Sequence, residues 1–294
     1  MEITAKKVAK YTFSGHDTFQ CRHFWLKKGF DLINSGKSFG MEDAVVELGV
    51  GKNMVSAIKY WMKAFDLMTN DEKPTPFAER LLNDNGWDPY LEDEGSLWLL
   101  HYHLVKKGLA TSYDLIFNEF RREKIEFTKS SYLSFLKRKA EQTGAFQVNE
   151  KTITDDFGVL IKMYIRSDAQ SKDKEDTLSG LFTELDLVKS VGRRGDEVFS
   201  IDNTEKNDIP AELILYAIIN MDDFDTSINL NTIENEQNSV GSIFAINRTG
   251  LTNKIEALIK KHDYITYSNH AGIRELQFKK KPDLLEILNS YYAN

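Results

Sequence analysis

Two histidines, an aspartate, an arginine and the only cysteine of the 294-residue chain lie close together near its start. They fall within the run Phe13-Ser14-Gly15-His16-Asp17-Thr18-Phe19-Gln20-Cys21-Arg22-His23-Phe24-Trp25-Leu26-Lys27-Lys28-Gly29. A histidine beside an aspartate can act as an oriented general base, and an arginine can stabilise charge on a phosphate. We therefore take as candidate catalytic residues His16, Asp17, Arg22 and His23.

The same residues allow two other interpretations. His16, Cys21 and His23 could ligate a metal, although their spacing matches no standard zinc motif and no second cysteine is present. Alternatively, His16 and Asp17 form a polar turn that caps the first helix, with Cys21 as a small buried residue. The residues alone leave the metal ligands unknown.

Other polar residues that could do chemistry have simpler explanations. His101 and His103 are two positions apart, so on a helix they face different sides, which favours core or interface roles. The acidic residues Asp88, Glu92, Asp93 and Glu94 could bind a divalent ion, but such a run is typical of a solvated helix start favoured by the helix dipole. The sequence contains no nucleotide-binding glycine loop, Walker lysine motif or nucleophile elbow.

The elements that would position the cluster at residues 13–29 are predicted to form a winged helix-turn-helix over residues 13–82. Helices are predicted at about 22–34, 41–48 and 52–65, with Gly36 ending the first and Gly49-Val50-Gly51 forming a turn before the third. Short strands near 67–69 and 73–75 then form a small wing, and Thr75-Pro76 caps a further helix. A winged helix-turn-helix, which is a DNA-binding module, has this order of elements: helix, short helix, glycine turn, long helix and hairpin.

The predicted helix 52–65 has two distinct faces. Val55, Ile58, Met62 and Phe65 form an apolar stripe that should face the core. The remaining positions carry donors and cations suited to phosphates and base edges. They are Lys52, Asn53, Ser56, Lys59, Tyr60 and Lys63. The alternative is that the module docks against protein, since this fold is reused for that purpose.

The rest of the chain is predicted to be mainly α-helical. A helical middle domain (83–200) has the apolar run Leu97–Leu100 at its centre and helices near 113–122, 130–142, 153–165 and 178–188. Residues 167–176 resemble a linker, and residues 202–208 form a second weak point. A second winged-helix-like domain (208–294) combines helices at 211–221, 232–237 and after 248 with strands at 264–267 and 274–278. Its candidate DNA contacts are Arg248, Thr249, Thr252 and Asn253.

Charge and composition favour a DNA-binding protein of the cytoplasm over a secreted or membrane protein. The net charge is −7, yet residues 1–65 carry ten Lys or Arg against six Asp or Glu (+4), whereas residues 66–120 carry four against eleven (−7). The basic surplus thus coincides with the first module, which favours contact with DNA there. A basic-rich run at 121–139 is typical of a solvated helical face. No signal peptide or membrane span is predicted, and a single cysteine suits the cytoplasm.

Several motifs resemble a bacterial family of DUF4007 type. The resemblance rests on the run from Phe13 to Gly29, on Glu42-Asp43-Ala44-Val45 with Leu48-Gly49-Val50-Gly51-Lys52-Asn53-Met54-Val55, and on Asp88-Pro89-Tyr90-Leu91-Glu92-Asp93 with Leu97-Trp98-Leu99-Leu100-His101. These motifs are long and specific. They cover residues 13–105 well, and the remainder matches loosely.

The resemblance implies a role in DNA sulfur modification. Members are encoded beside a cysteine desulfurase and an ATP-pyrophosphatase-like enzyme related to phosphoadenosine-phosphosulfate reductase. Such clusters replace a nonbridging phosphate oxygen of DNA with sulfur (phosphorothioation) as part of antiphage defence, and the component of this family is described as a DNA nickase. No catalytic residue set carries over. No cofactor is certain, and nicking would call for Mg²⁺ or Mn²⁺.

Three functions follow from the sequence. The first is a DNA-binding component of a phosphorothioation system that delivers partner enzymes to DNA and adds nicking as an activity. The second is a transcriptional regulator without catalysis, for which a homodimer would read half-sites one helical turn apart. The third is a protein-interaction adaptor, which would show no salt-dependent DNA binding.

Overall fold

The N-terminal part of the fold is a small helical module. The computed structural model describes residues 11–166, 179–193, 195–221, 224–270 and 273–293. Within them the module comprises α1 (Trp25–Asn34), α2 (Ala44–Leu48), α3 (Lys52–Ala64) and α4 (Pro76–Leu82). Between α3 and α4, a single antiparallel bridge, Met68 to Pro74, stands where the sequence predicted the two strands of a wing. Thr75 caps α4 through the amide of Ala78, as predicted.

The predicted core stripe of α3 is confirmed, since Val55, Ile58, Met62 and Phe65 are all buried. Gly29 on α1 allows the two helices to pack closely, because a Cβ there would lie 2.9 Å from Met62. In the turn before α3, only Gly49 has the left-handed conformation, with φ +63°. The module is thus held by one apolar face on each helix.

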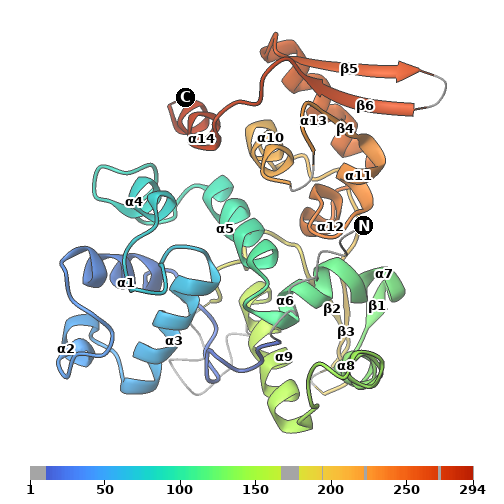
Figure 1. Ribbon diagram of the computed structural model, residues 1–294. Coiled ribbons are helices and arrows are strands. Elements are labelled where there is room, and N and C mark those ends of the chain that lie inside the picture. The colour runs from blue at the N-terminus through green and yellow to red at the C-terminus, as the bar shows by residue number, and fades with distance from the viewer. Residues whose placement is uncertain (1–10, 167–178, 194, 222–223, 271–272, 294) are drawn as a thin grey trace, which may run out of the picture.

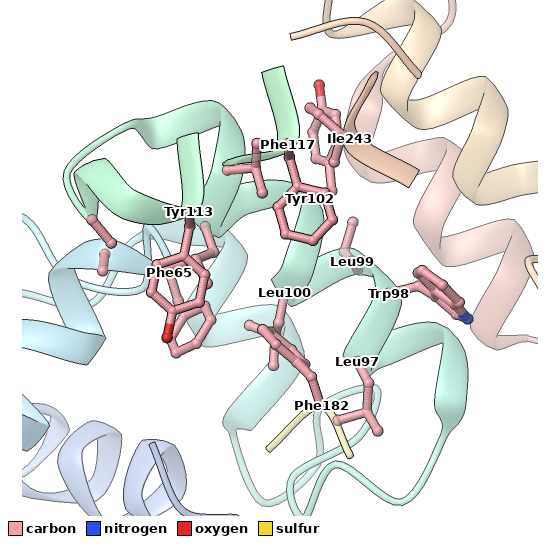
Figure 2. Close-up of a cluster of buried hydrophobic side chains, with 14 of the residues drawn as sticks. Phe65, Leu97, Trp98, Leu99, Leu100, Tyr102, Tyr113, Phe117, Phe182 and Ile243 are labelled. Carbon is pink, nitrogen blue, oxygen red and sulfur yellow. The ribbon is translucent and has the colours of Figure 1, made fainter. Parts of the chain in front are cut away.

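The middle of the molecule is built around α5 (Glu94–Lys107), which is buried along nearly its whole length. In Figure 1 it runs between the N-terminal helices and the C-terminal part of the fold. Aromatic and aliphatic side chains from several segments surround it (Figure 2). The elements that follow are α6 (Thr111–Leu115), a π-helical turn (Ile116–Phe120), α7 (Arg121–Glu123), α8 (Lys129–Thr143) and α9 (Glu150–Tyr164). A helix apolar on all sides must be enclosed by the rest of the protein.

The helix predicted at 178–188 is wrong. Residues 179–188 form turns, and they lead into β2 (Lys189–Val191) and β3 (Val198–Ser200), which join β1 (Glu126–Phe127) in an antiparallel sheet of order β1-β3-β2. The backbone amides of Leu181 and Phe182 bond to the carbonyls of Cys21 and Met163, at 3.1 and 2.9 Å. These tertiary bonds replace the helical ones. The linker predicted at 167–176 lies outside the described residues.

The C-terminal part begins with α10 (Ala211–Ile219) and continues with β4 (Ser227–Asn229), α11 (Leu230–Asn235), α12 (Val240–Phe244) and α13 (Arg248–Lys261). It ends with β5 (Ile265–His270), β6 (Ile273–Phe278) and α14 (Leu284–Tyr292). The strands form an antiparallel sheet of order β4-β6-β5. Residues 202–208, predicted as a weak point between domains, are held to the C-terminal part, since the Thr204 backbone forms hydrogen bonds with the backbone of Ala245 and Asn247.

The C-terminal part shares its core with the middle. His101 on α5 is buried, with its ring nitrogens 2.8 Å from the Tyr164 hydroxyl and the Ile243 carbonyl. Burial lowers the pKa of His101 to about 3, so the ring stays neutral. The predicted core role of this histidine is confirmed. Within the described residues, no helix is both long enough and apolar enough to cross a membrane.

The acidic cluster at the start of α5 is a docking point for α14. Asp93 caps α5 through the amide of Gly95 and also accepts a hydrogen bond of 2.7 Å from the Tyr291 hydroxyl. Asp88, which is buried, accepts the amides of Glu92 and Asp93. A helix start was the correct interpretation. Glu92 and Glu94 are exposed to solvent as predicted, whereas Asp88 and Asp93 are used inside the fold.

Candidate functional site

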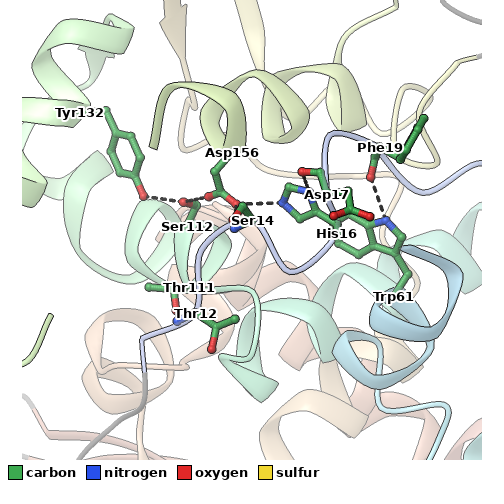
Figure 3. Close-up of polar contacts among 10 residues, drawn as sticks. All are labelled: Thr12, Ser14, His16, Asp17, Phe19, Trp61, Thr111, Ser112, Tyr132 and Asp156. Atoms are coloured by element: carbon green, nitrogen blue, oxygen red, sulfur yellow. Dashed lines mark hydrogen bonds and ion pairs between the residues drawn. The ribbon is translucent and has the colours of Figure 1, made fainter. Parts of the chain in front are cut away.

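The segment 11–24, which carries the candidate catalytic residues, is fastened to three helices. Thr12 exchanges two hydrogen bonds with Thr111 at the start of α6. The indole nitrogen of Trp61, on α3, donates to the Phe19 carbonyl at 3.0 Å. The amide of Ser14 donates to Asp156 on α9 at 2.9 Å. Figure 3 shows these contacts along the segment.

His16 lies inside the protein, with 1% of its surface exposed. Its Nε2 is 2.8 Å from Oδ1 of Asp156, and its ring stacks on Trp61 with centroids 5.1 Å apart. The ring of Tyr60 meets it edge-on. The His16 ring therefore faces the protein interior rather than solvent.

Asp156 is the centre of this buried network. It is 4% exposed and accepts hydrogen bonds from the Ser14 amide and the Ser112 hydroxyl in addition to its contact with His16. Ser112 in turn accepts from the Tyr132 hydroxyl at 2.9 Å. Burial raises the pKa of Tyr132, so that hydroxyl keeps its proton. One carboxylate thus links the N-terminal segment, α6, α8 and α9.

A cleft of about 490 Å³ opens on the solvent side of this network. It lies between the N-terminal segment, the first turn of α3 and the start of α9. Its lining residues are Ser14, Asp17, Thr18, Phe19, Asn53, Lys151, Thr152 and Asp155. The cleft therefore unites Asp17, a candidate catalytic residue, with Asn53, a candidate DNA contact.

The cleft presents two carboxylates from different elements. Asp17 is exposed and has a left-handed backbone (φ 52°), and Asp155 is exposed on α9. Together with the amide oxygen of Asn53 and nearby hydroxyls, these carboxylates would offer oxygen ligands, which suit Mg²⁺ because that ion binds one or two carboxylates and keeps several waters. No group of three or more His, Cys, Asp or Glu in the described residues could hold a metal. A site here would thus rely on the carboxylate pair.

Arg22 and His23 do not line the cleft. The Arg22 guanidinium lies over the ring of Trp25, 5.2 Å from its centroid, and His23 packs against Phe24. Cys21 is fully buried, as one interpretation predicted, and burial raises the pKa of its thiol. The segment does not cap α1, whose N-cap, Phe24, makes no side-chain bond.

The candidate DNA contacts of α3 differ in availability. Exposed side chains at its start are Lys52, Asn53 and Ser56. Lys59 is ion-paired with Glu72 in the connection between α3 and α4, and Glu72 also accepts a hydrogen bond of 2.9 Å from the Phe39 amide. Burial alone would raise the pKa of Glu72, but hydrogen bonds from Lys59 and from the Phe39 amide lower it overall. Lys63 is half-buried, and burial raises the pKa of half-buried Tyr60.

The candidate contacts of α13 are arranged differently. Arg248 is ion-paired with Glu234 on α11, with Nε 2.7 Å from the carboxylate. Thr249 and Asn253 are exposed and Thr252 is half-buried. This face is consequently less cationic than the start of α3.

Sequence reasoning did not identify Asp155, Asp156 or Lys151. A signal for Asp156 was present, because it shares the helical spacing of the buried residues Ile153, Leu160 and Met163 on α9. A carboxylate on an apolar stripe needs buried partners. Those partners come from segments over 40 residues away, so spacing alone could not name them.

Comparison with known proteins gives one family match and two structural matches. It matches a family described as "Protein of unknown function (DUF4007)" over residues 13–292. It is similar to a magnesium-ion-bound crystal structure of SspB (TM-score 0.86) and to a second SspB crystal structure (TM-score 0.85). In both cases the identity is 31%, covering 96% of this chain and 88% of the other. No curated protein matches the chain.

Proposed function

Because the chain belongs to the DUF4007 family, we propose that it is the DNA-binding component of a bacterial DNA phosphorothioation system, with nicking as its own activity. Likeness to SspB over 96% of the chain supports this assignment. So do the motifs at residues 13–55, which frame both the cleft and the start of α3. Such a protein would act on DNA in the cytoplasm.

The order of elements supports winged-helix modules at both ends. The N-terminal module has α1, α2 and α3 followed by the bridged wing. In the C-terminal module, α13 is followed by the β5–β6 hairpin, whose second strand also pairs with β4. A helix pair followed by a hairpin is suited to placing the second helix against DNA. The domain boundaries at 82 and 200–208 remain part of this proposal.

The observation that carries DNA binding is the exposed start of α3 beside the cleft. Lys52, Asn53 and Ser56 supply a cation and donors there, and Asn53 also lines the cleft. A phosphate backbone held by this turn would pass directly in front of Asp17 and Asp155. Lys151, on the opposite wall of the cleft, would bind a neighbouring phosphate.

For nicking, we propose that Asp17 and Asp155 hold Mg²⁺ or Mn²⁺ through their carboxylate oxygens. The ion would supply Lewis-acid stabilisation of charge on a phosphate. Among the four candidate catalytic residues, Asp17 is the one placed to touch a substrate in the cleft. His16 is buried and would act on the substrate only through Asp17. Arg22 and His23 do not line the cleft, so any part they play in nicking would be outside it.

The C-terminal module fits contact with partner proteins better than contact with phosphates. Glu234 neutralises Arg248, and Glu256 is exposed on the same helix. We propose that this face meets the cysteine desulfurase or the ATP-pyrophosphatase-like enzyme. A homodimer remains a further prediction.

The proposed nicking activity can be tested by measuring the relaxation of supercoiled plasmid. With Mg²⁺ or Mn²⁺, the wild-type protein should produce nicked circles, and Asp17→Asn and Asp155→Asn should abolish them without weakening DNA binding. Asp263→Asn, at an exposed aspartate after α13, is the matched control and should nick normally. Plasmid unchanged across metals, with DNA binding intact, would reject nicking and leave the DNA-binding role standing.

A further inference from the structure

We infer that Asp156 is the positioning residue of the cleft, setting the placement of Asp17 relative to Asp155; this rests on the proposed function. The carboxylate of Asp156 does not reach solvent, being 4% exposed. It therefore acts through the groups it holds rather than on a substrate.

Asp156 holds the loop that carries Asp17 at two points. It accepts the Ser14 amide at 2.9 Å and lies 2.8 Å from Nε2 of His16, the residue directly before Asp17. One face of the His16 ring also stacks on Trp61, with centroids 5.1 Å apart. Because His16 cannot shift without leaving both partners, the backbone at Asp17 is fixed in space.

The loop needs such an anchor because its backbone is strained. Ser14 and Asp17 both have left-handed conformations, with φ of 59° and 52°. These are unfavourable for residues with a Cβ and persist when surrounding contacts impose them. Within the loop, the Asp17 amide bonds to the Ser14 carbonyl at 3.0 Å, which closes a turn around His16.

The same helix supplies the opposite wall of the cleft. Asp155 precedes Asp156 on α9 and lines the cleft, whereas the Asp156 side chain points into the network. The spacing of the two cleft carboxylates is thus set through one residue of α9. Ser112 fixes the second oxygen of Asp156 and connects it to Tyr132.

Kinetics of plasmid nicking with Mg²⁺ test the inference. Asp156→Ala should lower kcat by about 100-fold, as expected for a displacement of about 1 Å at a reacting group. KM for DNA should be unchanged, because the start of α3 stays in place. Asp156→Asn, which keeps an acceptor for the Ser14 amide, should restore part of kcat, and Ser112→Ala should give an intermediate loss.

Tyr164→Phe is the control for general destabilisation. It removes a buried hydroxyl that contacts His101, away from the cleft, and should lower Tm while leaving kcat unchanged. An unchanged kcat in Asp156→Ala, an effect on KM alone, or an equal loss of kcat in Tyr164→Phe would overturn the inference.

Two measurements decide the inference without nicking. Amide exchange of residues 12–20 should accelerate in Asp156→Ala and Asp156→Asn but not in Tyr164→Phe, and Mn²⁺ binding followed by electron paramagnetic resonance should weaken in the same two variants. Unchanged exchange would overturn it. If the wild-type protein does not nick DNA at all, the nicking proposal fails while exchange still decides the role of Asp156.

Discussion

Replacing Lys52 by alanine should weaken DNA binding in a way that salt titration can measure. Lys52 is exposed in the first turn of α3, and within the described part of the chain its amine makes no ion pair. Loss of one phosphate contact should reduce the slope of log affinity against log salt by about 0.9. At about 0.1 M salt, release of one counterion then corresponds to about eightfold in affinity, or about 1.2 kcal/mol.

Lys59→Ala is the matched control on the same helix. Glu72 already neutralises Lys59, so this change should leave the salt slope nearly unaltered. Glu72→Gln should act in the opposite direction, because it frees Lys59 while keeping an acceptor for the Phe39 amide. That variant should steepen the slope by up to about 0.9.

Fluorescence anisotropy of a labelled duplex, titrated at several salt concentrations, measures all three variants. The reasoning is refuted if Lys59→Ala flattens the slope as much as Lys52→Ala, or if Glu72→Gln binds less tightly than the wild type. A wild-type affinity that does not depend on salt would remove the DNA-binding proposal itself, because phosphate contacts always release counterions.

Three further predictions concern stability and reactivity. Gly250→Ala should destabilise the fold by about 1–3 kcal/mol in chemical denaturation, because its Cβ would lie 2.1 Å from the Glu205 carbonyl oxygen; an unchanged midpoint would contradict this packing. With the pKa of His101 lowered to about 3 from 6.5, the unfolded state binds more protons between these values, so stability is full above pH 6.5 and falls as pH drops. At pH 5 the loss from His101 should be about 2 kcal/mol, and His101→Phe should show a shallower pH dependence. The Cys21 thiol should resist a thiol reagent in the native protein and react in denaturant, since it is fully buried with a raised pKa; rapid native labelling would refute this.

Local patterns predicted the helices of the N-terminal module and three of those in the C-terminal part, α10, α11 and α13, but they missed α12 and α14. The stripe from Val55 to Phe65 identified the core face of α3, and Thr75-Pro76 located the start of α4. Both are short-range signals, in which the side chain and the backbone group it affects lie within a few turns. Family membership was likewise predicted from the motifs in residues 13–105 and is confirmed over residues 13–292.

The segment 179–188 shows where local patterns failed. Its apolar spacing suggested a helix, but its amides bond to Cys21 and Met163. A backbone that finds partners on other segments has no need of helical bonds, and no local pattern records that choice. The sheet that follows it was missed for the same reason.

Residue types alone singled out the cluster at residues 13–29, and only the tertiary structure separated its buried members from its exposed ones. Packing of α3, α6 and α9 around the segment turned His16 inward to Asp156 and left Asp17 in the cleft with Asp155. Sequence by itself determined which groups were available and located most of the longer helices to within a few residues. Whether a polar group is buried among partners or open to a substrate depends on contacts between distant segments, because desolvation is decided by everything that surrounds the group.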